Sequence, residues 1–375
     1  MLRTLRVVHA WAGLVLALVV AVIAASGTLL VFKADYLRVA FPQAGSPAPT
    51  TPAALAAVLE SAQRRFPQQV RSVVFGTEAF GGHQVYLRDG GGAYLGTGGA
   101  LLAHWPANGR PEAWLFSLHE ELLGGETGHL VSGSVGLASA VLAVAGLVLW
   151  WPGARGFRGR LWPRTFTRRA LIAQHRDLGA VAALPILLVT LTGAAMVFPA
   201  PAQTLLAAVL PGGPATRVPA AAVPPATPPV SPDWARWLDL AQAQFPDATL
   251  RVVALAPEGE RVTVRLRQPR EWHPNGRTRV ELAAADGAVL KVHDALRDAP
   301  AARAFDALYP LHAAKVGGRA YDVVVAASGL ALTLLALLGG GSFAAWKFAR
   351  RRAPAAGARS SVGASPSRGP RSAST

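Results

Sequence analysis

The sequence predicts a mainly α-helical membrane protein, in which a bundle of four transmembrane helices carries two small α+β domains. Three observations support this fold class. Of the 375 residues, 51% are apolar and only 15% are charged, which is unusual for a soluble protein with a net charge of +16. Four apolar stretches are each long enough to cross a bilayer. The chain is also internally duplicated.

A helix crosses a bilayer with about 20 consecutive apolar residues. The first apolar stretch is too long for the core of a signal peptide, which takes roughly 7–15 residues. We therefore divide the chain into helices, domains, a loop and a tail. The segments are a first transmembrane helix (1–32), a first domain (33–129), a second helix (130–151), a basic loop (152–170), a third helix (171–198), a second domain (199–320), a fourth helix (321–346) and a basic tail (347–375).

Positive charge is concentrated in three segments that flank the predicted helices. The first six residues, the loop 152–170 and the tail 347–375 contain arginine but no Asp or Glu. Because basic flanking segments stay in the cytoplasm, we predict a multi-pass protein with both termini cytoplasmic and both domains on the opposite side. The division of the charge among three segments argues against nucleic-acid binding. The tail is rich in Ala, Ser, Gly, Pro and Arg and is predicted to be disordered.

The internal duplication covers both the helices and the domains. The unit of helix, domain and helix occurs twice. The matching segments are HAWAGLVLALVVAVIAASGTLLVF (9–32) with HRDLGAVAALPILLVTLTGAAMVF (175–198), AQRRFP (62–67) with AQAQFP (241–246), and SLHEELLGG (117–125) with PLHAAKVGG (310–318).

Each domain is predicted to begin with a helix and to continue with antiparallel strands separated by Gly-rich turns. The helices are expected over 53–66 and 233–245. The strands are expected over 71–75, 84–88, 93–95, 251–255, 261–267 and 278–282.

Four of the nine histidines occupy matched positions of the repeat next to predicted transmembrane helices. His9 and His175 begin helices that leave the cytoplasm, so this pair is expected at the inner boundary of the membrane. His119 and His312 precede helices that enter from the other side, so they form an outer pair. Two neutral imidazoles on opposing helices are what the iron of a b-type haem needs as axial ligands.

Glycines follow the histidines at helical spacing. Gly13 is one turn after His9, and Gly27 is five turns after it, so both lie on nearly the same face. Gly179 and Gly193 repeat this spacing in the second half. Small residues along one face make room for a flat macrocycle, although tight packing between helices uses small residues as well.

Other sites explain the histidines less well. A zinc site needs three or four clustered ligands, and a proton relay needs buried carboxylates, whereas Asp177 and Asp322 are interpreted as boundary residues. His129 is an alternative to His119 as the outer ligand, but its repeat partner is Asp322. The remaining histidines are expected to be surface residues, one of which could contact substrate. They are His83, His104, His273 and His293.

The motifs HAWAGL, SLHEELLGGETGHLVSG, AQHRDLGAV and LYPLHAAKVGG together resemble the PepSY-associated transmembrane helix family, also called iron-regulated membrane proteins. The resemblance covers about residues 1–352. It implies two PepSY-like domains in the periplasm and a location in the bacterial inner membrane. It also implies two b-type haems and reduction of ferric siderophores for iron uptake.

Carried over to this chain, the resemblance implies that His9 and His175 bind the inner haem iron and that His119 and His312 bind the outer one. His129 stands where a basic residue, often Arg, is expected. The chain has no flavin domain of the kind that some relatives carry, so a separate cytoplasmic or quinol donor is expected. With no cysteine in the chain, covalent c-type attachment of haem is not expected.

The sequence therefore predicts a haem-dependent ferric reductase that moves electrons across the membrane to an acceptor held between the two periplasmic domains. The alternative is a non-enzymatic binding or inhibitory protein that the helices anchor to the membrane. A transporter built from parallel repeats is a third hypothesis.

Overall fold

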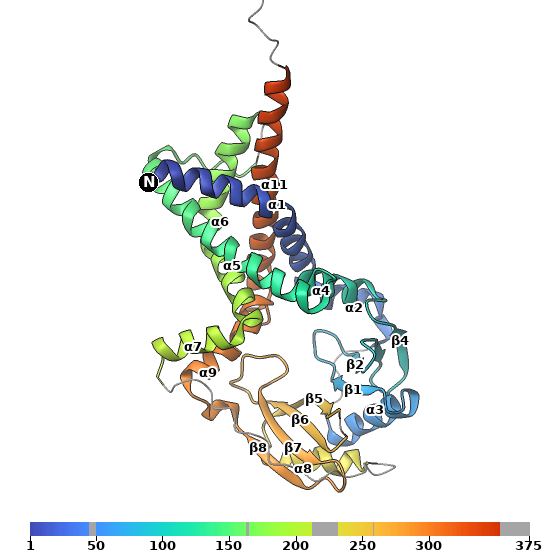
Figure 1. Cartoon of the computed structure of the whole chain (residues 1–375). Coiled ribbons are helices and arrows are strands. Elements are labelled where there is room, and N and C mark those ends of the chain that lie inside the picture. Colours follow the sequence, from blue (N-terminus) through green and yellow to red (C-terminus); the bar gives the residue numbers. More distant parts are fainter. Residues whose placement is uncertain (45–49, 163–164, 212–231, 258, 353–375) are drawn as a thin grey trace, which may run out of the picture.

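A computed structural model describes residues 1–44, 50–162, 165–211, 232–257 and 259–352 of the chain. Long helices form one end of the molecule and a β-sheet forms the other (Figure 1). Four helices in the described part are long and apolar enough to cross a membrane. They are α1 (Leu2–Val31), α5 (Gly125–Trp150), α6 (Arg168–Val197) and α11 (Gly318–Arg352).

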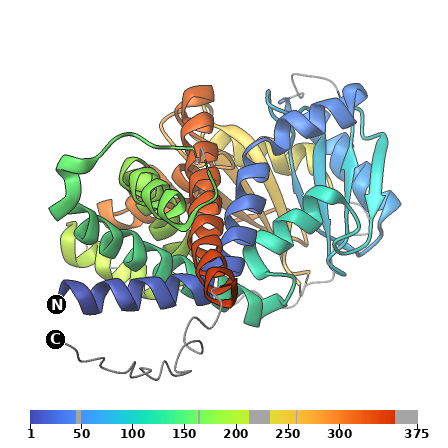
Figure 2. The same cartoon turned by 90° about the horizontal axis from the view of Figure 1, so that it is seen from above.

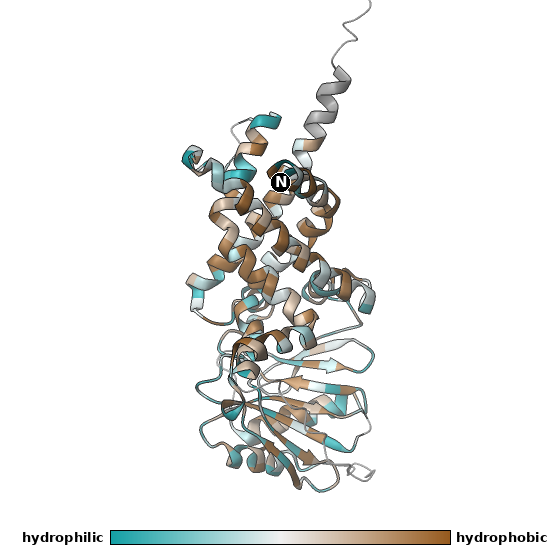
Figure 3. Cartoon of the chain, turned by 60° about the vertical axis from the view of Figure 1, so that its left-hand side comes forward, coloured by the Kyte–Doolittle hydropathy of each residue, from teal (hydrophilic) through white to brown (hydrophobic). Residues whose placement is uncertain are grey.

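The long helices of the bundle consist mainly of hydrophobic residues, as Figure 3 shows by their brown colour. Val15, Leu18 and Leu184 are each about three-quarters exposed, although all three are large apolar residues. Side chains of this kind are stable on a helix surface that lipid covers. The chain is therefore a membrane protein with four candidate spans.

The helices of the two halves pack against each other. Helix α1 packs against α11 (blue and red in Figure 2), and α5 packs against α6, so each half of the chain contributes one helix to each of these two contacts. A Cβ atom at Gly329 of α11 would lie 2.3 Å from Thr28 Oγ1 of α1. A Cβ atom at its repeat partner, Gly136 of α5, would lie 3.4 Å from the carbonyl oxygen of Thr190 on α6. Glycine at these positions lets the helix backbones approach closely.

All the strands belong to one antiparallel sheet. The first half contributes β1 (Val70–Val74), β2 (His83–Leu87), β3 (Gly92–Leu95) and β4 (Leu101–Trp105). The second half contributes β5 (Thr249–Leu255), β6 (Arg261–Arg267), β7 (Thr278–Ala283) and β8 (Val289–His293). The strand order is β4-β3-β2-β1-β5-β6-β7-β8, which is symmetric about the junction between β1 and β5.

The prediction of two separate small domains is therefore wrong in one respect. Each half does form a helix followed by antiparallel strands, but β1 and β5 pair edge to edge, with Val73 opposite Val253. An unpaired β1 would leave a row of backbone donors and acceptors open at its edge, and β5 satisfies them. The predicted space for an acceptor between two domains is consequently closed by the sheet.

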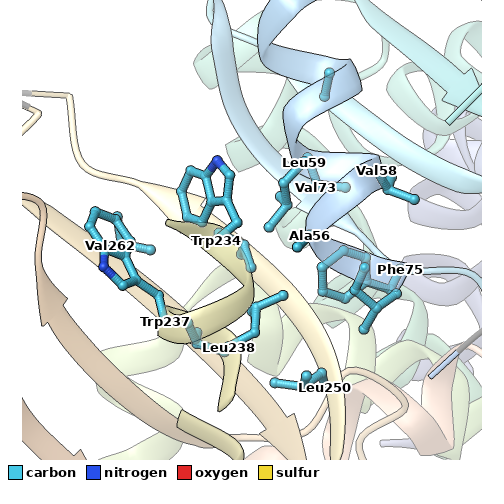
Figure 4. Close-up of a cluster of buried hydrophobic side chains, with 14 of the residues drawn as sticks. Ala56, Val58, Leu59, Val73, Phe75, Trp234, Trp237, Leu238, Leu250 and Val262 are labelled. Carbon is cyan, nitrogen blue, oxygen red and sulfur yellow. The ribbon is translucent and has the colours of Figure 1, made fainter. Parts of the chain in front are cut away.

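A shared hydrophobic core lies on one face of the sheet. Helices α3 (Pro52–Arg65) and α8 (Trp234–Gln244), one from each half, pack there side by side (Figure 4). The indole Nε1 of Trp234 donates to Gln63 Oε1 across the two halves at 2.8 Å. Leu59 and Val73 of the first half lie in the same cluster as Leu238 of the second. The sheet end of the molecule therefore folds around one core.

Several short elements were not predicted, because segments this short carry no clear hydrophobic period. Besides β4 and β8, these elements are helices α2 (Lys33–Ala40), α4 (Pro111–Glu121), α7 (Pro199–Val209), α9 (Pro300–Asp306) and α10 (Leu308–His312), with 3₁₀ turns at Pro42–Ala44, Trp151–Gly156 and Ala295–Arg297. Helix α11 continues to Arg352, beyond the predicted end of the fourth span at 346. The rest of the predicted tail, 353–375, lies outside the described residues.

A shared core makes a specific prediction. Leu238 is fully buried in α8, so Leu238→Ala should cost about 2–5 kcal/mol of unfolding free energy. Amide hydrogen exchange should then speed up in β1 and β2 as well as in β5 and β6. The control Leu290→Ala changes a 42% exposed residue of β8 and should leave these rates unchanged. Faster exchange confined to the second half would show that the two halves fold independently.

Candidate functional site

The outer pair of histidines lies on the two short helices that precede α5 and α11. His119 is near the end of α4, and His312 ends α10. Each short helix is followed by a residue with positive φ, Leu122 at 49° and Ala314 at 52°, which turns the chain before the long helix begins. The turns place both imidazoles against the bundle, between the sheet and the long helices.

His119 and His312 face each other across the two halves, with ring centroids 5.9 Å apart. The Nδ1 atom of His119 lies 2.8 Å from the carbonyl oxygen of Ile23, and that of His312 lies 2.9 Å from the carbonyl oxygen of Val189. A carbonyl oxygen only accepts, so Nδ1 carries the proton in each ring. This tautomer leaves Nε2 as the nitrogen with a free lone pair.

Burial keeps the outer imidazoles neutral. It lowers the pKa of His119, and together with the neighbouring His119 ring it lowers the pKa of His312 to about 4. A neutral imidazole is the form that binds a metal ion.

The second pair lies towards the opposite end of the bundle. His9 of α1 and His175 of α6 have ring centroids 6.2 Å apart, with the ring planes at 80°. The Nδ1 atom of His175 donates to the carbonyl oxygen of Leu335 on α11 at 3.0 Å. The Nδ1 atom of His9 is buried and has no hydrogen-bond partner in the described part of the chain. Each pair therefore takes one histidine from each half.

Two of the predicted glycines lie directly against the outer histidines. A Cβ atom at Gly27 would lie 2.6 Å from Cε1 of His119, and one at Gly193 would lie 2.9 Å from Cε1 of His312. The missing side chains of both glycines make room for imidazoles, and that they also make room for a macrocycle stays a prediction. A Cβ atom at Gly13 would meet no atom of another helix within 4 Å among the described residues, and one at Gly179 would lie 3.7 Å from Leu335.

The inner histidines also face glycines, which the sequence analysis missed. A Cβ atom at Gly146 of α5 would lie 3.5 Å from Cε1 of His9, and one at Gly339 of α11 would lie 3.7 Å from Cε1 of His175. Gly146 and Gly339 are matched by the same repeat register that matches His119 with His312. That register was the signal that could have identified them. Each histidine of the set thus packs against a glycine of another helix.

His129 has a different partner. Its Nδ1 atom lies 3.8 Å from the carboxylate of Glu120, and the ring opposite His312 is that of His119. His83 and His273 were predicted to be surface residues, but His83 is fully buried and His273 is only 8% exposed. His83 is buried because side chains alternate between the two faces of β2 and His83 lies on the buried face. His273 is buried within the loop between β6 and β7.

Asp177, which was interpreted as a boundary residue, holds the basic loop. Its side chain is fully buried, and its Oδ2 atom accepts from the backbone N–H groups of Arg158 and Arg160 at 3.4 and 3.2 Å. Oδ1 accepts from Nε of Arg176 at 2.8 Å. These contacts secure the loop between α5 and α6 beside the helix that carries His175.

The separation of the two rings in each pair is the separation expected if both imidazoles bound one metal ion. An imidazole nitrogen binds a first-row metal at about 2 Å, so two such bonds place the ring centres roughly 6 Å apart. The observed separations are 5.9 and 6.2 Å. Within the described ranges, no group of three or more His, Cys, Asp or Glu could hold a bare metal ion. Each pair offers two imidazole nitrogens, so a metal ion held here would need its other ligands from elsewhere.

Four long apolar helices joined to one antiparallel sheet define the class of this membrane protein. The family model described as PepSY-associated TM region matches residues 6–341. The match covers most of the chain, which therefore belongs to this family, as its motifs predicted. No curated protein matches the chain.

The contact between Gly27 and His119 can be tested by adding one methyl group. Gly27→Ala should push the imidazole away from Ile23 and cost about 1–3 kcal/mol of stability, because a packed ring has no space to move into. Gly13→Ala, in the same helix, should leave the stability unchanged, because a Cβ there has no neighbour within 4 Å on the other described helices. Thermal unfolding in detergent measures both, and equal shifts in Tm would contradict the assigned packing.

Proposed function

We propose that this protein carries electrons across the bacterial inner membrane through two b-type haems and reduces a ferric acceptor in the periplasm. The observation that carries the proposal is the presence of two histidine pairs, each formed across the two halves of the chain. One pair lies near the sheet and the other lies towards the opposite end of the bundle.

His119 and His312 would bind the haem iron near the sheet, and His9 and His175 would bind the other. Haem, when bound, supplies one-electron transfer. The chain holds the ligands in place through the bonds of Nδ1 to the carbonyl oxygens of Ile23 and Val189. Such bonds raise the basicity of the ligand and fix its orientation. The apolar helices exclude water and so influence the reduction potential.

The arrangement of charge supports an orientation for this transfer. The N-terminus and the basic loop between α5 and α6 lie at the end of the bundle away from the sheet (Figure 1). Basic segments of this kind stay in the cytoplasm. The sheet then lies in the periplasm, and the donor, a quinol or a separate cytoplasmic protein, acts at the basic end.

Fe(III) held by a siderophore is the acceptor that this proposal favours. Siderophores bind Fe(III) through hard oxygen donors, and the softer Fe(II) binds such donors less tightly. One electron delivered to the chelate would therefore release the iron for uptake.

A second candidate is a non-enzymatic, membrane-anchored binding or inhibitory protein. The continuous eight-stranded sheet supports it, because a large surface of this kind can hold a partner without any chemistry. A transporter made of parallel repeats is a weaker candidate. The reductase and the binding protein differ in whether the purified protein contains haem.

The absorption spectrum of the protein purified in detergent tests the proposal. A Soret band with about two haems per chain is expected after expression with adequate haem supply. His312→Ala and His9→Ala should each remove about half of the haem, because each breaks one pair. His129→Ala is the matched control and should keep the full content, since His129 contacts Glu120 instead.

A colourless preparation would end the reductase proposal and favour the binding protein. Loss of both haems in each single variant would disprove the assignment of one pair to each end. Loss of haem in His129→Ala would transfer the ligand role from His119 to His129.

A further inference from the structure

The second half of the chain contains a long loop that the first half lacks. Strand β2 is joined to β3 by a turn over residues 88–91, whereas β6 is joined to β7 by residues 268–277. The longer connection faces α9 and encloses with it a pocket of about 340 Å³. Because the short turn is enough to build the sheet, the longer loop points to a use beyond folding.

The loop is held rigidly by hydrogen bonds. Glu271 accepts backbone N–H bonds from Gln268, Arg277 and Thr278 at 2.7 to 2.9 Å. Arg251 of β5 donates from Nε to the carbonyl oxygen of Pro274 at 3.2 Å. A loop fixed in this way presents its side chains to a ligand at a small entropic cost.

The pocket has an excess of free positive charge. Of its acidic residues, Glu271 is engaged with backbone amides, and Asp306 pairs with Arg277 at 3.2 Å. Arg270 and Arg303 also line the pocket, and both are exposed. Neither guanidinium group makes a hydrogen bond or an ion pair with any residue that the structure describes. Two unpaired guanidinium groups facing one cavity favour an anionic ligand with several oxygen atoms.

An aromatic side chain accompanies these charges. Trp272 lines the pocket and is 56% exposed, although the loop around it is fixed. An exposed indole beside arginines can cover the flat, apolar part of a ligand while the guanidinium groups bind its charged oxygens.

The pocket lies close to the outer histidine pair. His273 forms part of its wall and stacks on Tyr309 of α10, with ring centroids 5.0 Å apart and planes at 29°. Tyr309 is one helical turn before His312, a rise of about 4.5 Å along the helix. Burial and the charges of Arg277, Arg265 and Arg267 lower the pKa of His273 to about 3, so the His273 ring adds no charge to the pocket at pH 7.

We infer that this pocket binds an anionic ferric chelate whose iron is held by carboxylate or catecholate oxygens. That the ligand is a ferric chelate rests on the proposed reductase function, whereas the preference for an anion rests on Arg270 and Arg303 alone. A chelate in this pocket is separated from the outer histidine pair by His273 and Tyr309.

Binding can be measured without any electron transfer by using gallium, which forms the same chelates as Fe(III) and is not reduced. Calorimetry on the full chain in detergent compares Ga(III)–citrate, which is anionic, with a Ga(III)–trihydroxamate, which carries no negative charge, and with metal-free citrate. Ga(III)–citrate should bind at least tenfold more tightly than the trihydroxamate chelate, and high salt should weaken its binding.

The double variant Arg270→Ala/Arg303→Ala should weaken binding of Ga(III)–citrate at least tenfold, which is about 1.4 kcal/mol. Arg64→Ala/Arg236→Ala removes the same charge from the exposed surfaces of α3 and α8 and should change the affinity less than twofold. Arg270→Lys/Arg303→Lys keeps the charge and should retain part of the affinity, which separates loss of charge from loss of folding.

Unchanged binding in the alanine variant, or an equal loss in the surface control, would overturn the inference. Tighter binding of the uncharged chelate or of free citrate would overturn it as well. The absorption spectrum of the same samples reports separately on haem. Protein that lacks haem but binds Ga(III)–citrate through Arg270 and Arg303 would refute the proposed function and leave the binding site intact.

Discussion

The structure depends on the edge-to-edge pairing of β1 with β5. Each half of the chain builds four antiparallel strands, and each leaves the edge of its first strand without a partner. Backbone donors and acceptors at such an edge must be satisfied, and the repeat offers an equivalent edge. Pairing the two edges closes one sheet over one core and sets the halves in a symmetric arrangement. The long helices that enter and leave the sheet are then brought together in a matching arrangement.

The same symmetry brings the imidazoles into pairs. A histidine at one repeat position meets its counterpart from the other half, both near the sheet and towards the far end of the bundle. Glycines on neighbouring helices let the rings lie against the backbone. For three of the four rings, backbone carbonyl oxygens fix the tautomer. The repeat thus supplies two pairs of imidazoles that neither half could form alone.

The loop between β6 and β7 departs from this symmetry. The connection between β6 and β7 is longer than its counterpart, and it carries Trp272 and Arg270 beside the helix that leads to His312. A duplicated scaffold can be retained for architecture alone, whereas a fixed loop that differs between the halves adds chemistry to one side. In the proposed reductase, the symmetric part would hold the redox centres and the asymmetric part would select the acceptor.

Local hydrophobic period and internal similarity were enough to predict the four apolar helices, the repeat and most of the strands. The register of the repeat also identified the four histidines. The pairing of the two halves in one sheet could not be predicted, because the sequence of an edge strand does not reveal its partner. Packing likewise decided that Gly27 faces His119, that Asp177 is buried and that a pocket lies beside His273. Contacts between residues far apart in the chain depend on how the elements are arranged, which no local pattern records.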